Sequence, residues 1–264
     1  MISSTFKYLV SHLSGTRLAK NTLVAKTFYY LKSFLKKKYV IIDNKILYLD
    51  KFDSLGLSLN GDYETKERDF IKNHIKKTDI VIDIGANMGY YTLFFSSLAA
   101  KVYAFEPDPT NFSILQKNIA ANKLTNVITE QKAVSNKNGT TYLKLNSLNT
   151  GGHHITEISK DTIPIDTVIL DDYIDHADFI KMDIEGAETL ALMGMKRLLQ
   201  KDIKLLIEYN PLGLDNFGFD PYAYLFLLSK HFTVIDMNNG EKIDIDVLAT
   251  SRKITNLFCY KERI

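Results

Sequence analysis

From Asp79 to Pro211 the sequence alternates short apolar runs with segments that have helical spacing. The runs DIVIDIG (79–85), KVYAFEPD (101–108), NVITEQKAVS (126–135), HADFIKMDIEG (176–186) and IKLLIEYNP (203–211) are each typical of a buried strand. Continuous apolar strands that are separated by helices form parallel sheets with helices on both faces. The later runs FTVIDM and NLFCY predict an antiparallel end to the same sheet. The fold class is therefore α/β.

Positive charge gathers at the start of the chain. Residues 1–40 contain eight Lys or Arg and no Asp or Glu, and FYYLKSFLKKK (28–38) mixes aromatic residues with lysines at helical spacing. Such a helix either lies on an anionic membrane surface or packs its aromatic face on the main domain. KYVIIDNKILYLD (38–50) predicts a hairpin or two short strands on either side of Asp43 and Asn44. We expect a basic helical and hairpin extension over residues 1–60 and a second unit over 61–264.

Composition narrows the class of protein. A chain of 264 residues suits one domain with an appendage. Its net charge of +2 gives no large basic field of the kind that nucleic-acid binding uses. The sequence has no apolar run of about 18 residues and no secretory signal, and its single cysteine, Cys259, excludes an internal disulfide. We expect a cytoplasmic protein whose basic start could contact a membrane surface.

The turn after the first strand indicates a nucleoside ligand. In DIGANMGYYT (83–92), Gly85 and Gly89 bracket a tight turn from strand to helix, and Asp83 ends the strand. Open α/β sheets bind ligands at this edge. Glu106 ends the second strand, where a carboxylate can accept both hydroxyl hydrogens of a ribose.

The sequence of this turn also indicates which class of nucleoside ligand binds. A dinucleotide site favours G-x-G-x-x-G, and this spacing is missing, as is a Gly-Lys-Ser or Gly-Lys-Thr phosphate loop. Asp83 beside the turn disfavours a phosphate and suits a cation. A methionine-derived ligand, with an ammonium, a sulfonium and no phosphate, therefore fits best. A dinucleotide oxidoreductase and a catalytically inactive cofactor-binding scaffold stay open as alternatives.

These motifs resemble the FkbM family of methyltransferases. The resemblance rests on DIVIDIGANMGYYT, FEPDPTNFSILQKNIAANKL, QKAVS, LDDYI, FIKMDIEGAETLALMGM and LLIEYNP, which follow in that order from about Tyr63 to Pro211. It implies a Rossmann-like class I methyltransferase fold with a mostly parallel, seven-stranded sheet, the cofactor S-adenosyl-L-methionine, and a sugar or other small-molecule hydroxyl as acceptor. The residues that it places at the cofactor are Asp83, Gly85, Asn87, Gly89, Glu106 and Ala133. We expect Thr92 and Asp183 at the same site.

The end of the fourth strand carries the candidate catalytic groups. In KMDIEGAE (181–188), Lys181 and Asp183 share one face of the strand because alternate residues point the same way. A hydroxyl acceptor must lose a proton, so a nearby base helps methyl transfer. We expect Asp183 to contact the cofactor or the acceptor, with Glu185 beside it, and Glu188 to serve the start of a helix. Glu208, which ends the fifth strand, points to the same edge.

Two histidines form a second candidate group. His153 and His154 follow a glycine pair in GGHHI, and His153 could act as a base near neutral pH. Asp183, Glu185, Glu208 and His153 are possible metal ligands, but their spacing matches no metal motif, so we predict no metal. NPLG (210–213) is not the NPPY-type motif of N-methyltransferases, which makes N-methylation a weaker alternative.

Overall fold

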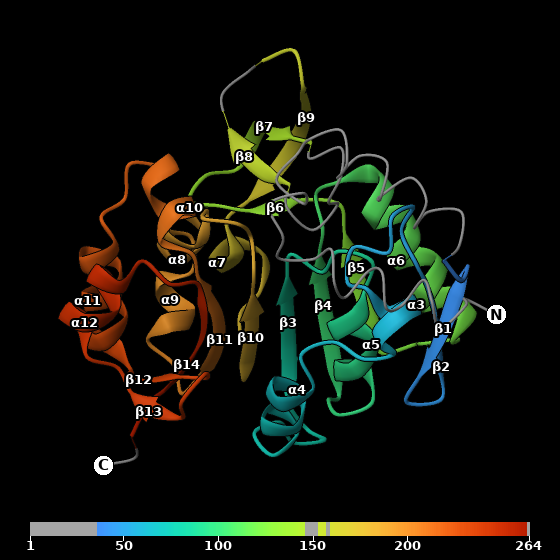
Figure 1. Ribbon diagram of the computed structural model, residues 1–264, viewed down its shortest axis with the longest axis horizontal. Helices are drawn as coiled ribbons and strands as arrows, with labels where there is room; N and C mark the ends of the chain where they lie inside the picture. Colours follow the sequence, from blue (N-terminus) through green and yellow to red (C-terminus); the bar gives the residue numbers. More distant parts are fainter. Residues whose placement is uncertain (1–35, 146–152, 157–158, 263–264) are drawn as a thin grey trace.

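The computed structural model describes residues 36–145, 153–156 and 159–262 (Figure 1). The basic helix expected around residues 28–38 and the glycine pair at 151–152 fall largely or wholly outside these ranges. Within them, no helix is long and apolar enough to cross a membrane.

An eight-stranded sheet forms the centre of the protein. Its strands run in the order β13-β12-β14-β11-β10-β3-β4-β5. Their bounds are β3 Ile80–Ile84, β4 Lys101–Phe105, β5 Val127–Glu130, β10 Phe179–Met182, β11 Lys204–Tyr209, β12 Thr233–Asp236, β13 Glu241–Lys242 and β14 Thr255–Tyr260. The five strands from β11 to β5 are parallel, and β14, β12 and β13 add an antiparallel end. The antiparallel end was expected, and β13 brings the strand number to eight instead of seven.

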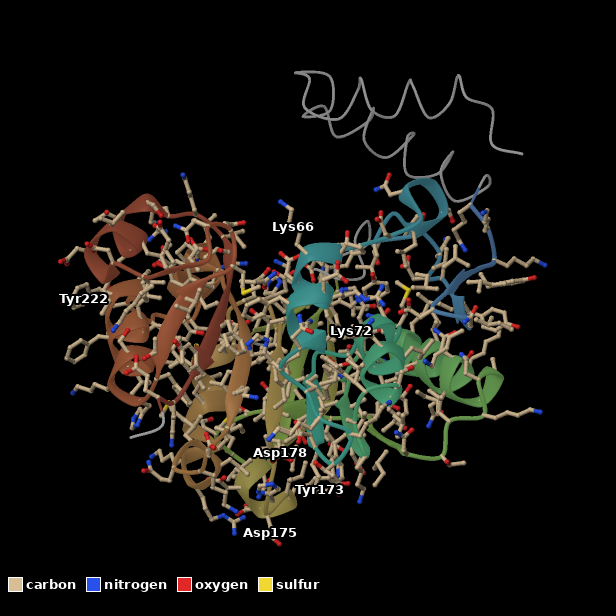
Figure 2. All side chains as sticks on the ribbon, turned by 90° about the horizontal axis from the view of Figure 1, so that it is seen from below. Lys66, Lys72, Tyr173, Asp175, Asp178 and Tyr222 are labelled. Atoms are coloured by element: carbon tan, nitrogen blue, oxygen red, sulfur yellow. The ribbon has the colours of Figure 1, made fainter. Side chains whose placement is uncertain are left out.

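The two faces of the sheet bury alternate residues of each strand. Ile82, Ile180 and Ile207 pack on one side in a cluster that includes residues of α8, α9 and α11. Val81, Phe179 and Leu206 pack on the other side, with residues of α4 and α5. The helices around the sheet are α4 Thr65–Lys72, α5 Tyr90–Ser96, α6 Pro109–Ala121, α7 Leu170–Tyr173, α8 Glu188–Met193, α9 Lys196–Leu199, α10 Pro211–Asn216, α11 Pro221–His231 and α12 Ile245–Ser251. Tyr222 of α11 points outward from one flank of the molecule (Figure 2).

A second, four-stranded sheet lies above the carboxyl ends of β3 and β4 (Figure 1). It contains β6 Ala133–Val134, β7 Gly139–Lys144, β8 His154–Thr156 and β9 Thr162–Val168, in the order β6-β9-β7-β8. The expected third strand therefore divides: residues 127–130 join the main sheet, and residues 133–134 join the second one. The division places this small sheet over the edge where the site forms.

The expected hairpin is present as β1 (Tyr39–Ile42) and β2 (Lys45–Tyr48), with α3 (Leu57–Asn60) after it. Asn118 of α6 and Asn122, the C-cap of the same helix, hold the outer edge of β2. Asn122 pairs with the backbone of Ile46, and Asn118 pairs with the backbone of Tyr48. Asn118 also donates to the carbonyl of Met88 at 2.7 Å, so one side chain links the hairpin to the glycine turn.

The spacing of AETLALMGMKRLLQ (187–200) predicts a single helix. This prediction is wrong, because α8 and α9 are separate. The break falls at Gly194, where a Cβ would lie 2.0 Å from the carbonyl oxygen of Ser135. Asp171 then accepts the backbone N–H groups of Arg197 and Leu198 and holds the start of α9. The amphipathic spacing of ETKERDFIKNHIKK (64–77) likewise predicts a longer helix than the structure has, since α4 ends at Lys72.

Candidate functional site

A cavity of about 190 Å³ opens where β3 and β10 lie side by side. The chain moves outward in one direction from β3 to β4 and β5, and in the other direction from β10 to β11. Such a switch in strand order leaves a crevice at the carboxyl ends of the strands. The residues that line it include Asp83, Gly85, Asn87, Glu106, Ala133, His153, Asp183, Glu185 and Glu208. The structure thus brings most of the expected site residues into one cavity.

The glycine turn at one end of the cavity packs closely against the end of β10. Gly85 has a φ of +80°, and a Cβ there would lie 2.0 Å from the carbonyl oxygen of Asp183. A side chain at this position would therefore separate β3 from the residue that follows β10. The absence of a Cβ lets the two strand ends approach, which is the reason for glycine here.

The amides of this turn are all occupied. Gly85 and Ala86 donate to the carbonyl of Phe105, and Asn87 donates to Glu106 at 2.7 Å. Met88 donates to the side chain of Asn87. A pyrophosphate would need these N–H groups, so the turn is not built as a phosphate site. This observation argues against the dinucleotide alternative.

Glu106 is fixed at the tip of β4. One carboxylate oxygen accepts the N–H of Asn87, and the other accepts the N–H of Asp108 at 2.9 Å. The side chain is almost fully buried yet lines the cavity. Burial raises the pKa of Glu106 to about 8, although the hydrogen bonds from the two backbone N–H groups lower it. Each oxygen has a second lone pair for a ligand hydroxyl. This geometry suits a ribose whose two hydroxyls point at one carboxylate.

Three expected cofactor residues support the turn in different ways. Asp83 is fully buried, lines the cavity and accepts a 2.5 Å hydrogen bond from Thr92. Thr92 does not line the cavity, so its role is to hold Asp83. Gly89 does not line it either, and a Cβ there would lie 2.6 Å from Leu115 of α6. Gly89 and Thr92 therefore position the site without facing it.

Strand register explains why the groups at the other end of the cavity meet. Lys181 pairs with Asp83 across β10 and β3, and Met182 pairs with Ile207 across β10 and β11. The same register, extended by one residue, places Asp183 beside Glu208. Lys181 and Asp183 share a face, as expected, and form a 3.1 Å ion pair. Burial alone lowers the pKa of Lys181, but Asp183 and then Asp83 raise it above its ordinary value.

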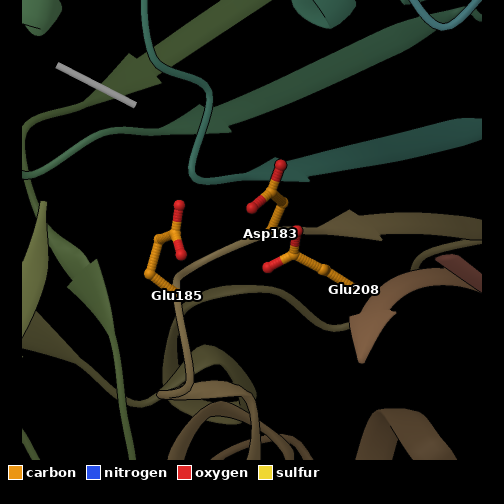
Figure 3. Close-up of side chains that lie close together, drawn as sticks. All are labelled: Asp183, Glu185 and Glu208. Atoms are coloured by element: carbon orange, nitrogen blue, oxygen red, sulfur yellow. The ribbon is translucent and has the colours of Figure 1, made fainter. Parts of the chain in front are cut away.

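Asp183, Glu185 and Glu208 form an acidic cluster (Figure 3). One oxygen from each lies within 4.8 Å of the others. Burial, followed by the charge of Asp183, raises the pKa of Glu185 to about 7 and that of Glu208 to about 9. Glu185 holds a left-handed backbone with a φ of +56°, which costs energy for a residue with a side chain. Carboxyl groups with such raised pKa values can take up and release a proton near neutral pH, and their oxygens are also of the type that binds divalent cations.

His153 lies at the other end of the cavity from this cluster. Its Nε2 is 3.9 Å from the carboxylate of Asp108, which follows Glu106 by two residues. Burial lowers the pKa of His153, and the charges that act on it are Asp108, His154 and Asp50. The structure therefore groups His153 with the nucleoside-side residues and not with Asp183 and Glu185. Glu188 is buried and accepts the N–H of Ile184, which fits the structural role expected for it.

The sequence reasoning missed an aromatic wall of the cavity, formed by Tyr63 and Tyr91. Tyr91 lies under the ammonium of Lys181, 4.9 Å from Nζ to the ring centroid, and donates to Glu64 at 2.7 Å. Burial raises the pKa of Tyr63, and the neighbouring Glu64 raises it further. Tyr63 lines the same cavity as the acidic cluster. The YY pair directly after Gly89 was the available signal for Tyr91. Tyr63 precedes α4, and no sequence motif pointed to it as a residue of the cavity.

Residues 83–234 match the family model described as the methyltransferase FkbM domain. The hexuronic acid methyltransferase AglP of Haloferax volcanii is 27% identical over 172 residues, which cover 62% of this chain and 68% of that protein. The 2-O-methyltransferase NoeI of Sinorhizobium fredii is 26% identical over 205 residues, which cover 68% of this chain and 82% of that protein.

Among solved structures, a methyltransferase FkbM from Methylobacillus flagellatus is 17% identical, with a TM-score of 0.46, and covers 92% of this chain and 61% of its own. The protein SMU.1697c from Streptococcus mutans, solved with SAH, is also 17% identical, with a TM-score of 0.48, and covers 74% of this chain and 96% of its own. The family assignment rests on the domain match, which spans more than half of the chain. The protein belongs to the FkbM family of methyltransferases, as the motifs led us to expect.

Proposed function

We propose that this protein is an S-adenosylmethionine-dependent O-methyltransferase that acts on a hydroxyl group of a sugar. The observation that carries the proposal is one cavity with two chemically different ends. Glu106 offers free lone pairs at one end, and the Asp183–Glu185–Glu208 cluster offers proton acceptors at the other. The relatives named for a hexuronic acid and for 2-O-methylation support a sugar as the acceptor class.

The residues of the cavity fit this cofactor. Glu106 would hold the ribose hydroxyls, and Ala133 lies on the cavity wall, where it leaves room for the adenine. Asp83 is fully buried, and its Oδ1 has no hydrogen-bond partner among the described residues. A buried carboxylate oxygen of this kind is costly unless a donor or a cation reaches it. The ammonium of the methionine part would supply that partner.

The cofactor supplies an activated methyl group on a sulfonium, so the protein's task is to align the acceptor oxygen and to remove its proton. Lys181 holds Asp183 in place through the 3.1 Å ion pair. Asp183 would orient the acceptor hydroxyl at the carboxyl end of β10. Glu185, with a pKa of about 7, would accept the proton that the hydroxyl loses. Positioning of this kind can contribute about 7–11 kcal/mol to lowering a barrier.

Two measurements test the proposal. Calorimetry with S-adenosylhomocysteine should show binding to the wild-type protein, whereas NAD and NADP should show none. A mass-spectrometric screen of sugars and glycans, incubated with the protein and S-adenosylmethionine, should show a gain of one methyl group on an oxygen. Failure of S-adenosylhomocysteine to bind, or methylation of an amine only, would contradict it.

A further inference from the structure

The acceptor end of the cavity holds more carboxyl groups than cations. Asp183, Glu185 and Glu208 lie within 4.8 Å of one another, and Asp83 lines the same cavity. The lysines that line it are Lys181 and Lys132, and the structure pairs Lys181 with Asp183 and Lys132 with Glu130. Among the described residues, no further Lys or Arg lines this cavity.

Two buried oxygens in this cavity are left without a hydrogen-bond partner in the described part of the chain. They are Oδ1 of Asp83, a residue with 0% exposure, and Oε2 of Glu208. Burial of a polar atom without a partner is unfavourable, because the atom loses its hydrogen bonds to water. An ionised carboxylate oxygen accepts a hydrogen bond, and a protonated carboxyl group can also donate one, so a hydroxyl group, which does both, can pair with either form. The ammonium of the cofactor would pair with Asp83, and a polar group of the acceptor would pair with Glu208.

The cluster already resists further negative charge. Burial and the neighbouring carboxylate of Asp183 raise the pKa of Glu185 to about 7 and that of Glu208 to about 9. The three carboxyl groups lie close enough for their negative charges to repel one another, and Lys181 pairs with Asp183 alone among them. An additional carboxylate would force further proton uptake or remain unpaired, whereas a hydroxyl or an ammonium would donate to the oxygens that lack partners.

An aromatic side chain faces the same space. Tyr63 lines the same cavity as Asp183, Glu185 and Glu208, and burial and the neighbouring Glu64 raise its pKa. The ring is held edge to face against Tyr90, with centroids 5.7 Å apart. A fixed aromatic ring next to carboxylate acceptors suits a ligand with an apolar C–H face and a rim of hydroxyls.

We propose that the acceptor is a neutral or amino sugar that donates its hydroxyl or ammonium groups to Asp183, Glu185 and Glu208 and lays its apolar face on Tyr63, and that the site rejects a uronic acid. This inference rests on the proposed function and names the substrate class of the same cavity. Glu208 is then a specificity-determining residue, because it adds a third carboxyl group at the acceptor end without holding the cofactor.

The test uses sugars that differ only in charge. The p-nitrophenyl glycosides of glucose, galactose and mannose are each compared with their 2-amino-2-deoxy and uronic acid forms. Binding to the full-length protein, saturated with S-adenosylhomocysteine, is measured by calorimetry at pH 7.5. We expect at least one neutral or amino form to bind at least tenfold more tightly than the matching uronic acid, a ratio that corresponds to about 1.4 kcal/mol.

Variants connect this selectivity to the proposed residues. Glu208→Gln removes one ionisable group and should reduce the discrimination against the uronic acid by about threefold or more. Glu241→Gln is the matched control, because Glu241 is exposed on β13, at the far edge of the same sheet. Tyr63→Phe should retain sugar binding, and Tyr63→Leu should weaken it several-fold while S-adenosylhomocysteine affinity stays the same.

The outcomes separate the two proposals. Tighter binding of the uronic acids, or no binding of any glycoside to the S-adenosylhomocysteine-loaded protein, overturns the acceptor class and leaves the cofactor assignment intact. Failure of S-adenosylhomocysteine itself to bind overturns the proposed function. The ratio of the affinity for the neutral or amino sugar to that for the matching uronic acid is the decisive quantity. If this ratio were the same in Glu208→Gln, Glu241→Gln and wild type, Glu208 would not be the source of the selectivity.

Discussion

At the Glu106 end of the cavity, both oxygens of the carboxylate accept backbone amides, whereas at the Glu208 end one carboxylate oxygen has no partner among the described residues. The first end is built from main-chain groups that one short segment of sequence supplies. The second is built from side chains of two neighbouring strands and a strained turn. Backbone donors hold the Glu106 carboxylate in one position whichever ligand binds. A buried carboxyl oxygen without a partner, in contrast, favours a ligand that can form a hydrogen bond with it. The contrast suits a constant cofactor at one end and a specific acceptor at the other.

The largest effect should come from Gly85→Ala, which tests the close packing of the glycine turn against the end of β10. The new Cβ would lie 2.0 Å from the carbonyl oxygen of Asp183, an atom of the backbone that cannot move aside. We expect a loss of about 3 kcal/mol or more in the free energy of unfolding, measured by denaturant titration.

Gly240→Ala is the control for this change. Gly240 has a similar φ of +75°, but a Cβ added there would have no atom of the described residues within 4 Å, apart from its own chain neighbours. The substitution should cost only the left-handed backbone penalty, about 1–2 kcal/mol. Equal losses in the two variants would show that the contact between the glycine turn and the end of β10 is unimportant.

Glu106→Ala should weaken cofactor binding by about 1–3 kcal/mol, because the ribose hydroxyls lose their acceptor. The variant also leaves the N–H groups of Asn87 and Asp108 without their carboxylate, so the free energy of unfolding should fall as well. Titration with S-adenosylhomocysteine measures the first effect. Glu241→Ala should change neither quantity, and unchanged affinity in Glu106→Ala would remove Glu106 from the site.

Asp183→Asn tests the other end. The amide keeps one oxygen acceptor but loses the charge that pairs with Lys181, so the acceptor should be oriented less well. With an acceptor from the glycan screen, we expect turnover to fall about tenfold, or about 1.4 kcal/mol. The affinity for S-adenosylhomocysteine should change less than this.

Asp178→Asn makes the same substitution at the opposite end of β10, where Asp178 accepts the N–H of Ile80 (Figure 2). It should leave turnover close to wild type. If Asp183→Asn and Asp178→Asn behaved alike, the role of Asp183 at the acceptor would be wrong.

The two ends also differed in how far the sequence could predict them. Gly85 follows one strand and Glu106 follows the next, about twenty residues later, so their spacing placed them at one edge of the sheet, and the family resemblance added Asn87. Asp183 and Glu208 were each placed at the ligand edge, but their meeting depends on the register of β10 against β11, which no local pattern specifies. Tyr63 lies before the sheet begins, and only the packing of α4 and α5 on β3 and β10 brings it to the cavity.

The fold shows the same division between local and long-range information. The parallel strands and the antiparallel end followed from apolar runs and their separation. The second sheet did not, because β7, β8 and β9 are half-exposed strands whose pattern resembles a polar loop. The local pattern places Gly194 inside one helix, since its close approach to Ser135 comes from a segment about sixty residues earlier.

The smallest effect concerns pH and depends on the sign of the shifts. Burial raises the pKa of Glu208 to about 9, above the ordinary value near 4.5 that the unfolded chain should have. Between these values the folded protein keeps a proton that the unfolded chain has lost, so the free energy of unfolding falls as the pH rises from about 5 to 9.

Glu208→Gln removes this group and should flatten the slope by about 0.5 kcal/mol per pH unit, after allowance for its partial exposure. S-adenosylmethionine, which has a sulfonium, should reduce the pH dependence more than S-adenosylhomocysteine, which has none. Equal slopes in wild type and Glu208→Gln, measured by thermal unfolding without ligand, would mean that Glu208 is ionised in the folded protein and that the acceptor end is less crowded with charge than its geometry indicates.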